Sequence, residues 1–444
     1  MTSATSATAA PSSDGGRKDF NVAVVGGGIG GLTLAIGLHD RGVPVHIFES
    51  ASKFAEIGAG IAIGPNAQNA LQRLGLYESF LQFADFPSRN LFFQWRMGEG
   101  EEQRLLSETI CKQYGMASIH RAELLDTFVK RMPTELCSFG KRLKDIQQPE
   151  SAEGKVRITF EDGSTHDADL VIGCDGIHSR VRGALDRATA GPSAVAGSDS
   201  LVWSGSWAYR GLIPRERFVA ALGKEKGEFY ADTAQMLLAK DSHVLIFPIH
   251  GGKTVNIVAF RTDRSRWPQR TPFPKGEAWI QETSKEELMR DFANYSSDVV
   301  KMVECIDKPS KWALHQVVPS LTSYINGRVI VAGDAAHGGV PHQGAMAGQA
   351  IEDALFLSNL LSHPRVKAQN LTQALGAYDR IRVPRANRVL ESSLEAGDTY
   401  EFRGVAADDP AKLGEHLVER FDHIWDYDLD KEKQQMEEWL DANL

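Results

Sequence analysis

Apolar residues near the start of the chain form a short strand that runs directly into a helix. Residues 22–25 are a continuous apolar run, which is typical of a strand buried on both faces. Residues 32–38 continue as an apolar helix, and Gly42 follows its end. A second apolar run at residues 45–48 completes a predicted strand–helix–strand unit with parallel strands.

Further along, the pattern alternates between two kinds of strand. Residues 156–160 alternate in polarity and pair through a turn with a return strand, whereas residues 170–172 and 329–332 are short buried runs that each end near an aspartate. Residues 200–320 are aromatic-rich, with short runs typical of antiparallel strands. From about residue 371 onward, the spacing is helical.

These patterns predict an α/β fold with two domains. We expect a disordered leader over residues 1–19 and a nucleotide-binding domain built from residues 20–195 and 321–400, with an excursion into the second domain near residues 80–110. The second domain should cover residues 196–320. We expect a helical tail over residues 401–444, and its acidic end, residues 427–444, is interpreted as an exposed helix and solvated cap because of its charge pattern.

The first strand and helix are joined by a glycine fingerprint. Gly26, Gly28 and Gly31 have the G-x-G-x-x-G spacing that brings the backbone close to a pyrophosphate at a helix N-terminus. Glu49 ends the second strand, where an acidic residue takes a ribose hydroxyl and repels a phosphorylated ribose. The site therefore favours FAD or NAD over NADP, and a membrane helix is disfavoured by six glycines in one apolar stretch.

A second glycine-rich segment lies more than 300 residues downstream. There, a buried strand ends at Asp334, and a glycine-rich stretch opens the helix predicted over residues 343–361. Together with the early fingerprint, this segment indicates one flavin held from both ends of the chain, and hence an enzyme.

Composition narrows the partners. A net charge of −9 with no basic stripe argues against nucleic acid. The four cysteines, which have no C-x-x-C spacing, exclude a thioredoxin-type redox pair and give no reason to expect a metal. The leader lacks the apolar region of a secretory signal, so we expect a cytoplasmic protein without a membrane anchor.

Four motifs in order resemble those of the class A flavoprotein monooxygenases, the single-component FAD-dependent aromatic hydroxylases. They are GGGIGG with Glu49, HRAEL at 120–124, CDGIHSRVR at 174–182 and GDAAHGGVPHQGAMAGQAIEDA at 333–354. WAYRGLIP and PHQGA make the chain most similar to the salicylate hydroxylase group. The resemblance implies a Rossmann-type FAD-binding domain, as in para-hydroxybenzoate hydroxylase, an antiparallel-sheet substrate domain and C-terminal helices.

The resemblance also assigns cofactor residues. Gly26, Gly28, Gly31 and Glu49 would hold the ADP half of FAD, and Arg121 would reach its pyrophosphate or ribityl chain. The segment with Asp175 is linked to both FAD and the nicotinamide nucleotide, and Asp334 would bind the ribityl chain. The helix start formed by Gly344, Ala345 and Met346 would face the flavin pyrimidine. Met346 departs from the family pattern, which has glycine there.

In this family NADH or NADPH reduces FAD, and one atom of O2 is delivered to an electron-rich phenolic ring. His342 is our first candidate for hydrogen bonding the phenol or carboxylate of the substrate. Tyr209, Arg210 and Arg261 are weaker substrate-side candidates, and His337 is interpreted as a residue that fixes the loop under the flavin. With salicylate, attack at the carboxyl-bearing carbon would release CO2 and give catechol.

Several alternatives remain open. A nicotinamide dehydrogenase would use the same glycines without needing the distant Asp334 segment. A disulfide reductase should show a second fingerprint and a C-x-x-C, and neither exists in the sequence. A non-catalytic flavin-binding protein, or a hydroxylase of 3-hydroxybenzoate or 6-hydroxynicotinate, is compatible with the motifs. The sequence also leaves open whether NADH or NADPH is the reductant. It does not decide between a monomer and a homodimer.

Overall fold

The computed structural model describes residues 17–54, 60–86, 90–112, 114–149, 151, 154–189, 200–263, 265, 278–407 and 409–444. Most of the predicted leader, and the predicted domain boundary between residues 195 and 196, lie outside the described residues. Lys18, at the end of the predicted leader, already belongs to the fold, because its Nζ donates to the carbonyl oxygen of Val366 at 2.9 Å.

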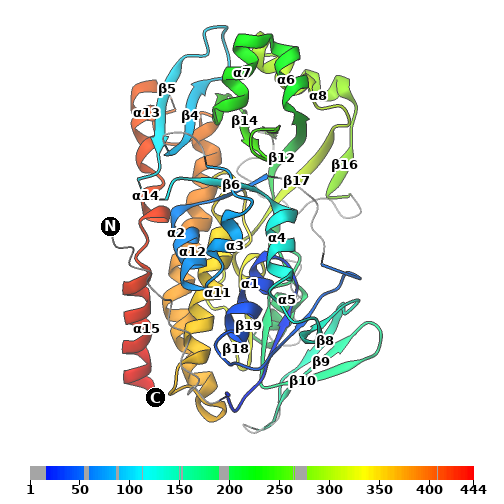
Figure 1. Cartoon of the computed structure of the whole chain (residues 1–444), viewed down its shortest axis with the longest axis vertical. Helices are drawn as coiled ribbons and strands as arrows, with labels where there is room; N and C mark the ends of the chain where they lie inside the picture. The colour runs from blue at the N-terminus through cyan, green and yellow to red at the C-terminus, as the bar shows by residue number, and fades with distance from the viewer. Residues whose placement is uncertain are drawn as a thin grey trace, which may run out of the picture.

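A six-stranded sheet forms the nucleotide-binding half (Figure 1). Its neighbouring strands are, in order, β18 (Ile325–Asn326), β19 (Val329–Val331), β11 (Leu170–Gly173), β1 (Val22–Val25), β2 (Val45–Phe48) and β7 (Cys137–Ser138). All pairs are parallel except β18 with β19. The predicted parallel strands and the α/β fold class are therefore confirmed.

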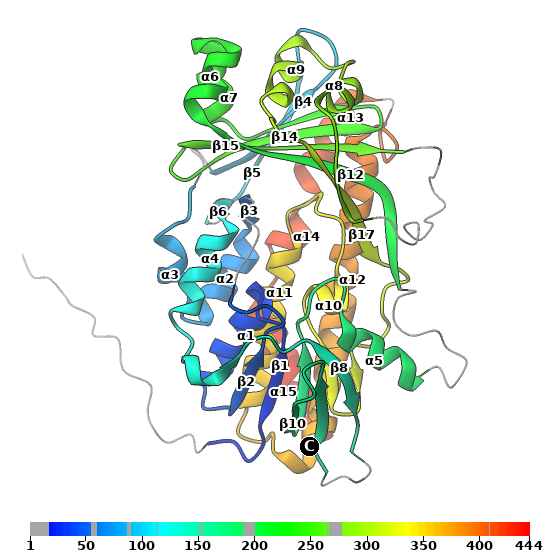
Figure 2. The ribbon, with the colours of Figure 1, turned by 90° about the vertical axis from the view of Figure 1, so that its right-hand side faces the viewer.

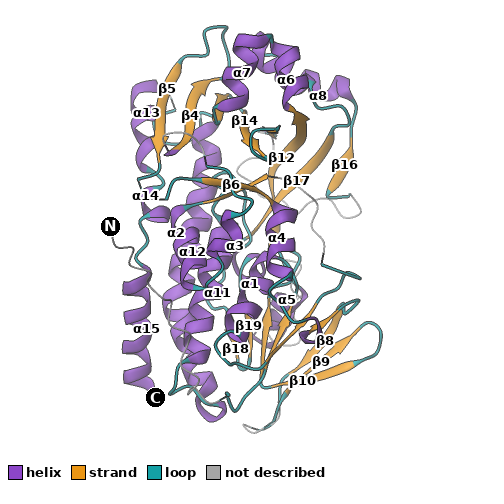
Figure 3. Cartoon of the chain, in the orientation of Figure 1, coloured by secondary structure: helices purple, strands orange, loops and turns teal. Residues whose placement is uncertain are grey.

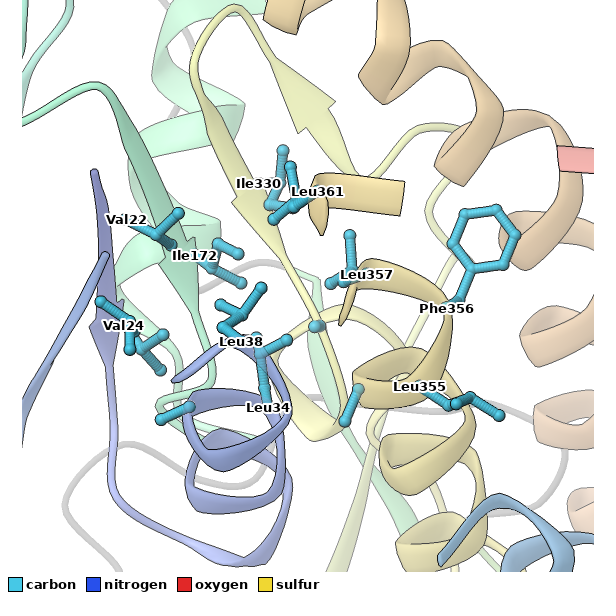
Figure 4. Packing of buried hydrophobic residues seen from close by; sticks show 14 of the residues in the cluster. Val22, Val24, Leu34, Leu38, Ile172, Ile330, Leu355, Phe356, Leu357 and Leu361 are labelled. Atoms are coloured by element: carbon cyan, nitrogen blue, oxygen red, sulfur yellow. The ribbon is translucent and has the colours of Figure 1, made fainter. Parts of the chain in front are cut away.

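Two helices cover one face of this sheet. Figure 4 shows side chains of α1 (Ile29–His39) and α11 (Met346–Ser362) packed against residues of β1, β11 and β19. The two helices approach closely at Gly37, where a Cβ would lie 2.4 Å from Ser358 Oγ. Beside them lie α2 (Pro65–Arg73), α3 (Tyr77–Leu81), α4 (Arg121–Val129) and the ribbon of β3 (Gly60–Ile63) with β6 (Ala117–His120).

An antiparallel meander lies beside the sheet. It comprises β8 (Leu143–Gln147), β9 (Val156–Phe160) and β10 (Thr165–Ala168), as the alternating pattern predicts. The rings of Phe48 and Phe160 are 4.9 Å apart and join the meander to β2. α5 (Arg180–Thr189) follows β11.

The second half is built on an eight-stranded sheet (Figures 2 and 3). Its order is β16 (Ile280–Glu282), β17 (Ser310–Val317), β12 (Leu201–Pro214), β15 (Thr254–Thr262), β14 (Ser242–Ile249), β13 (Gln235–Ala239), β4 (Leu91–Met97) and β5 (Leu105–Ile110). Only β13 and β4 pair in parallel. The outer face is covered by α6 (Arg215–Leu222), α7 (Lys224–Asp232), α8 (Lys285–Asp291) and α9 (Ser297–Glu304).

A long helix, α12 (Leu371–Tyr400), runs along both halves (Figures 1 and 2). At one end the hydroxyl of Tyr378 donates to Val331 O at 3.2 Å, and at the other the ring of Tyr400 lies 5.0 Å from that of Trp95. This helix therefore fixes the two halves on a common element.

The C-terminal helices are α13 (Pro410–Glu419), α14 (Asp422–Trp425) and α15 (Leu429–Asn443). The interpretation of this tail as a solvated cap is wrong for the inner face of α15, because Leu429, Met436 and Leu440 are buried. Glu432 is buried too, and its carboxylate accepts from Arg382 Nη1 at 2.9 Å. Charge pattern alone could not reveal that α15 supplies part of the core.

Candidate active site

The strand ends of the parallel sheet converge on the glycine turn between β1 and α1. Gly26 has a φ of +108°, and a Cβ there would lie 2.4 Å from Cys174 O at the end of β11. At Gly31 a Cβ would lie 2.0 Å from Gly26 O. Neither position has room for a side chain. Gly28, the N-cap, makes no side-chain cap, so the first N–H groups of α1 are available to an anion.

Glu49 lies beside this turn, as its place at the end of β2 predicts. Its Oε2 accepts from Gly27 N at 2.7 Å, and its Oε1 accepts from Ala51 N at 2.7 Å. The half-buried carboxylate therefore lies where a ribose hydroxyl would approach a nucleotide bound on the turn.

The distant Asp334 segment reaches the same edge of the sheet. β19 pairs with β11 and β11 with β1, all in parallel, so their carboxyl ends share one side. Asp334 is half-buried, and within the described part of the chain its carboxylate makes no hydrogen bond. This carboxylate is therefore available to a polyol or ribityl chain.

The start of α11 is also open. Gly344 has a φ of +62°, and a Cβ there would lie 3.3 Å from Ala62 Cβ on β3. Ala345 is the N-cap and Met346 the first helical residue, and no side chain caps the helix. The unpaired N–H groups of this 17-residue helix therefore present partial positive charge to whatever lies in front of it.

A buried charge network holds the loop that carries Asp334. His337 Nε2 lies 2.6 Å from Asp353 Oδ2, which also accepts from Gly333 N at 2.9 Å. Arg382 Nε donates to the other oxygen of Asp353 at 2.9 Å. Although burial alone would raise the pKa of Asp353, the charges of His337 and Arg382 hold it well below its ordinary value. Asp353 thus links His337 to the backbone of Gly333, and a role of His337 in holding this loop stays a prediction.

Two arginines, one from each half of the molecule, interact electrostatically at the junction of the halves. Arg121 is the first residue of α4, and Arg210 lies on β12 with its guanidinium 5.0 Å from the ring of Trp312. Burial and the positive charge of Arg121 lower the pKa of Arg210. A pair of cations with this mutual repulsion gains stability from an anionic ligand.

Asp175 does not lie free for a ligand in this structure. Its carboxylate accepts from Ser179 Oγ at 2.5 Å, Arg180 N at 2.7 Å and Val181 N at 3.2 Å, and so it caps α5. Burial raises the pKa of Asp175 in spite of these bonds. The contact of this segment with the glycine turn runs through backbone atoms, since the Asp175 Cα would be 2.8 Å from a Cβ at Gly26.

His342 lies between α12 and the inner face of the large sheet. Its ring centroid is 5.3 Å from that of Phe260, and a Cβ at Gly397 would lie 2.7 Å from its Nε2. Its Nδ1 is buried and, among the described residues, has no hydrogen-bond partner. Burial, with the neighbouring His243, lowers the pKa of His342 to about 3. The ring is therefore neutral at pH 7.

A second histidine beside His342 was not anticipated from the sequence. His243, on β14, stacks on Phe260 with ring centroids 4.4 Å apart, and its Nδ1 lies 3.1 Å from Glu401 Oε1. A small pocket borders this region. Its lining includes Ser204, Ser206, Thr262, His342, Asp398 and Glu401. A buried histidine on a strand is usually a core residue. Only the position of His243 next to His342 in the structure marks it as a candidate site residue.

Two predicted substrate-side residues lie on the opposite face of the sheet. Tyr209 packs against the outer helices, and its hydroxyl donates to Asp291 Oδ2 at 2.6 Å. Arg261 alternates with Phe260 along β15 and interacts electrostatically with Tyr295 on the same outer side. This placement contradicts the expectation that the two side chains contact the same substrate as His342. Arg210, the neighbour of Tyr209, is the one on the inner face.

The burial of His342 predicts a pH dependence of stability. Because its folded pKa is near 3, the unfolded chain takes up a proton below about pH 6.5 that the folded chain does not. The free energy of unfolding should therefore fall from pH 6.5 to pH 5. In a His342→Leu variant this fall should be smaller by about 1–2 kcal/mol.

Urea unfolding at pH 7 and pH 5 measures this difference. His39→Leu, at an exposed histidine, is the matched control and should keep the wild-type pH dependence. Equal losses of stability in wild type and His342→Leu would contradict the low pKa of His342.

Comparison with known proteins gives a consistent family. The sequence model of a family described as "FAD binding domain" matches residues 19–393. A salicylate hydroxylase of Pseudomonas putida is 40% identical over 424 residues, covering 93% of this chain and 94% of the relative. A 6-methylsalicylate 1-monooxygenase of Aspergillus terreus, atA, is 37% identical, covering 93% of this chain and 90% of the relative.

Solved structures show the same fold as this chain. A salicylate hydroxylase in a substrate complex superposes with a TM-score of 0.84 at 38% identity, over 94% of this chain and 98% of the other. CtdE in complex with FAD and a substrate shares the fold, with a TM-score of 0.76 at 23% identity over 96% of this chain and 99% of the other. Among the described residues, no helix is long and apolar enough to cross a bilayer.

Proposed function

The chain belongs to the class A flavoprotein hydroxylases and is an FAD-dependent aromatic monooxygenase, and from this premise we propose that it converts salicylate to catechol with release of CO2. One salicylate, one NADH, one O2 and two protons would give one catechol, one CO2, one NAD⁺ and one water. The observation that carries the proposal is the buried Nδ1 of His342, which has no hydrogen-bond partner among the described residues and belongs to a residue four positions before the open start of α11.

We assign the ends of the cofactor to the two halves of the split site. Gly26, Gly28 and Gly31 would hold the pyrophosphate at the start of α1, and Glu49 would bind the ribose. Asp334 would take the ribityl chain. The residues fit FAD, because the cradle has no room for Cβ atoms and the Asp334 carboxylate is not used elsewhere among the described residues. When bound, FAD supplies hydride acceptance and oxygen activation.

The start of α11, with Gly344, Ala345 and Met346, would stabilise negative charge on the flavin pyrimidine. Met346 fills a position where a smaller residue would leave more room. Arg121 and Arg210 would bind an anionic group of the cofactor or substrate at the junction of the halves, and the repulsion between the two cations supports this assignment.

His342 would position the phenol. Its neutral ring can accept a hydrogen bond from the phenolic hydroxyl at Nδ1, which increases the electron density of the ring that is attacked. Because burial disfavours the imidazolium, a proton taken up there has to pass on, and a polar side chain that lines the adjoining pocket, such as Glu401, would accept it. The aromatic ring of Phe260 would exclude water from the other side.

The proposed substrate is tested by a panel of aromatic acids. Salicylate is expected to stimulate NADH oxidation by the FAD-loaded protein and to give catechol and CO2 in equal amounts. The panel also contains 6-methylsalicylate, 3-hydroxybenzoate and 6-hydroxynicotinate, each with product identification.

The outcomes are distinct. If salicylate is not converted and another acid of the panel gives a hydroxylated product without CO2, that acid replaces salicylate as the proposed substrate. If no aromatic acid stimulates NADH or NADPH oxidation by the yellow protein, the catalytic proposal fails, and a flavin-binding role without turnover takes its place.

A further inference from the structure

Three side chains that commonly bind metals meet where the two halves join. His120 is the last residue of β6, Glu123 lies in the first turn of α4, and His250 follows β14. One ligand atom from each lies within 4.8 Å of those of the other two. All three residues are half-buried, so their ligand atoms can be reached from solvent while their positions are held by the fold.

The turn that carries His250 is fixed in place. His250 has a φ of +56°, and Gly251 and Gly252 follow with positive φ. The carboxylate of Asp85 accepts from Gly251 N at 2.9 and 3.0 Å, which ties the turn to the nucleotide-binding half. The position of the imidazole therefore does not depend on a loose loop.

The ring of His250 also has the arrangement of a ligating histidine. Its Nδ1 lies 3.3 Å from Thr254 Oγ1, and its Nε2 lies 3.7 Å from Glu123 Oε2. With the proton on Nδ1, that nitrogen donates a hydrogen bond to Thr254 Oγ1, and the lone pair of Nε2 is directed toward the side of Glu123. A partner on the distal ring nitrogen is the usual support of a metal-binding histidine.

The two imidazoles lie next to one another. The ring centroids of His120 and His250 are 4.9 Å apart. Two nitrogens and one carboxylate oxygen match the preferences of Zn²⁺ and related ions, whereas Mg²⁺ and Ca²⁺ prefer oxygen ligands alone.

We propose that His120, Glu123 and His250 bind a divalent transition-metal ion of the Zn²⁺ type, with water in the remaining positions. The ion would join the β14–β15 turn to the N-terminus of α4, whose first residue is Arg121. It would thus brace the junction of the two halves beside the proposed anion site.

The test uses the tag-free, FAD-loaded protein after treatment with a chelator. Titration with ZnCl2, followed by calorimetry, should show one saturable site per chain, and the melting temperature should rise once Zn²⁺ exceeds its dissociation constant. MgCl2 should do neither. His250→Asn and Glu123→Gln should each weaken Zn²⁺ binding by at least about tenfold, because each loses one of three ligands.

The variants are chosen to fold. Asparagine tolerates the positive φ at position 250, and glutamine keeps the size of Glu123. His39→Asn, at an exposed histidine, is the matched control and should bind Zn²⁺ like wild type. Zn²⁺ affinity unchanged in His250→Asn, or no saturable binding to wild type, overturns the proposal. Since the measurement is metal binding, it is independent of the substrate test.

Discussion

Replacing Gly31 with valine is expected to give a colourless protein that no longer retains FAD. A Cβ at this position would lie 2.0 Å from the backbone oxygen of Gly26, which has no rotamer to escape into. The first turn of α1 would therefore move away from the phosphates. Overpacking typically costs about 1–3 kcal/mol, and with a backbone clash we expect FAD affinity to fall by about 100-fold or more.

Visible flavin absorbance per protein and titration of the apoprotein with FAD measure this loss. Gly42→Asn is the matched control, because Gly42 has a φ of +74° that asparagine tolerates, and open space where its Cβ would lie. It should keep wild-type affinity. If Gly31→Val binds FAD as tightly as wild type, the pyrophosphate does not rest on this turn.

Replacing His342 with leucine is expected to lower kcat for catechol formation by about 10²–10⁴-fold while FAD stays bound. Leucine has a similar volume, but it cannot accept the hydrogen bond of the phenol at the position of Nδ1. The remaining NADH oxidation should become uncoupled from product formation. Rapid-quench measurement of catechol, together with the ratio of catechol formed to NADH consumed, separates this effect from weaker substrate binding.

The controls for this experiment lie on the other face of the same sheet. Arg261→Gln and Tyr209→Phe should leave kcat within about threefold of wild type, because both side chains point toward the outer helices. A His342→Leu enzyme with wild-type kcat would remove His342 from the mechanism. A large loss of kcat in Arg261→Gln would instead support the expectation from the sequence that Arg261 contacts the substrate.

The cofactor half was predictable because its signals are local. A buried strand, a glycine turn and an acidic residue after the next strand occupy one short stretch, and each of these patterns predicts one kind of structure. The parallel pairing of β1 with β2 followed from this stretch. The neighbouring places of β11 and β19 could be inferred only from the repeated pattern of a buried strand that ends near an aspartate.

The substrate side was less predictable because a strand does not reveal which face is inner. A shift of one residue exchanges Tyr209 for Arg210, and only the packing of β12 against the outer helices decides between them. His243 and Glu401 lie about 160 residues apart in sequence, and nothing local marks them as a pair. The burial of Glu432 was not predictable either, because its ion pair with the distant Arg382 is not visible in the sequence.

The order of strands in the six-stranded sheet also limits how the protein can be made. β1 and β19 lie on either side of β11, yet about 300 residues separate them in the chain. At about 5–20 residues per second, a ribosome needs roughly 15–60 s to deliver the last of these strands after the first. β11 is completed about 150 residues before β19 begins, so for roughly half of that time it lacks its partner on one side, and the unfinished sheet keeps an open edge to which other chains can add.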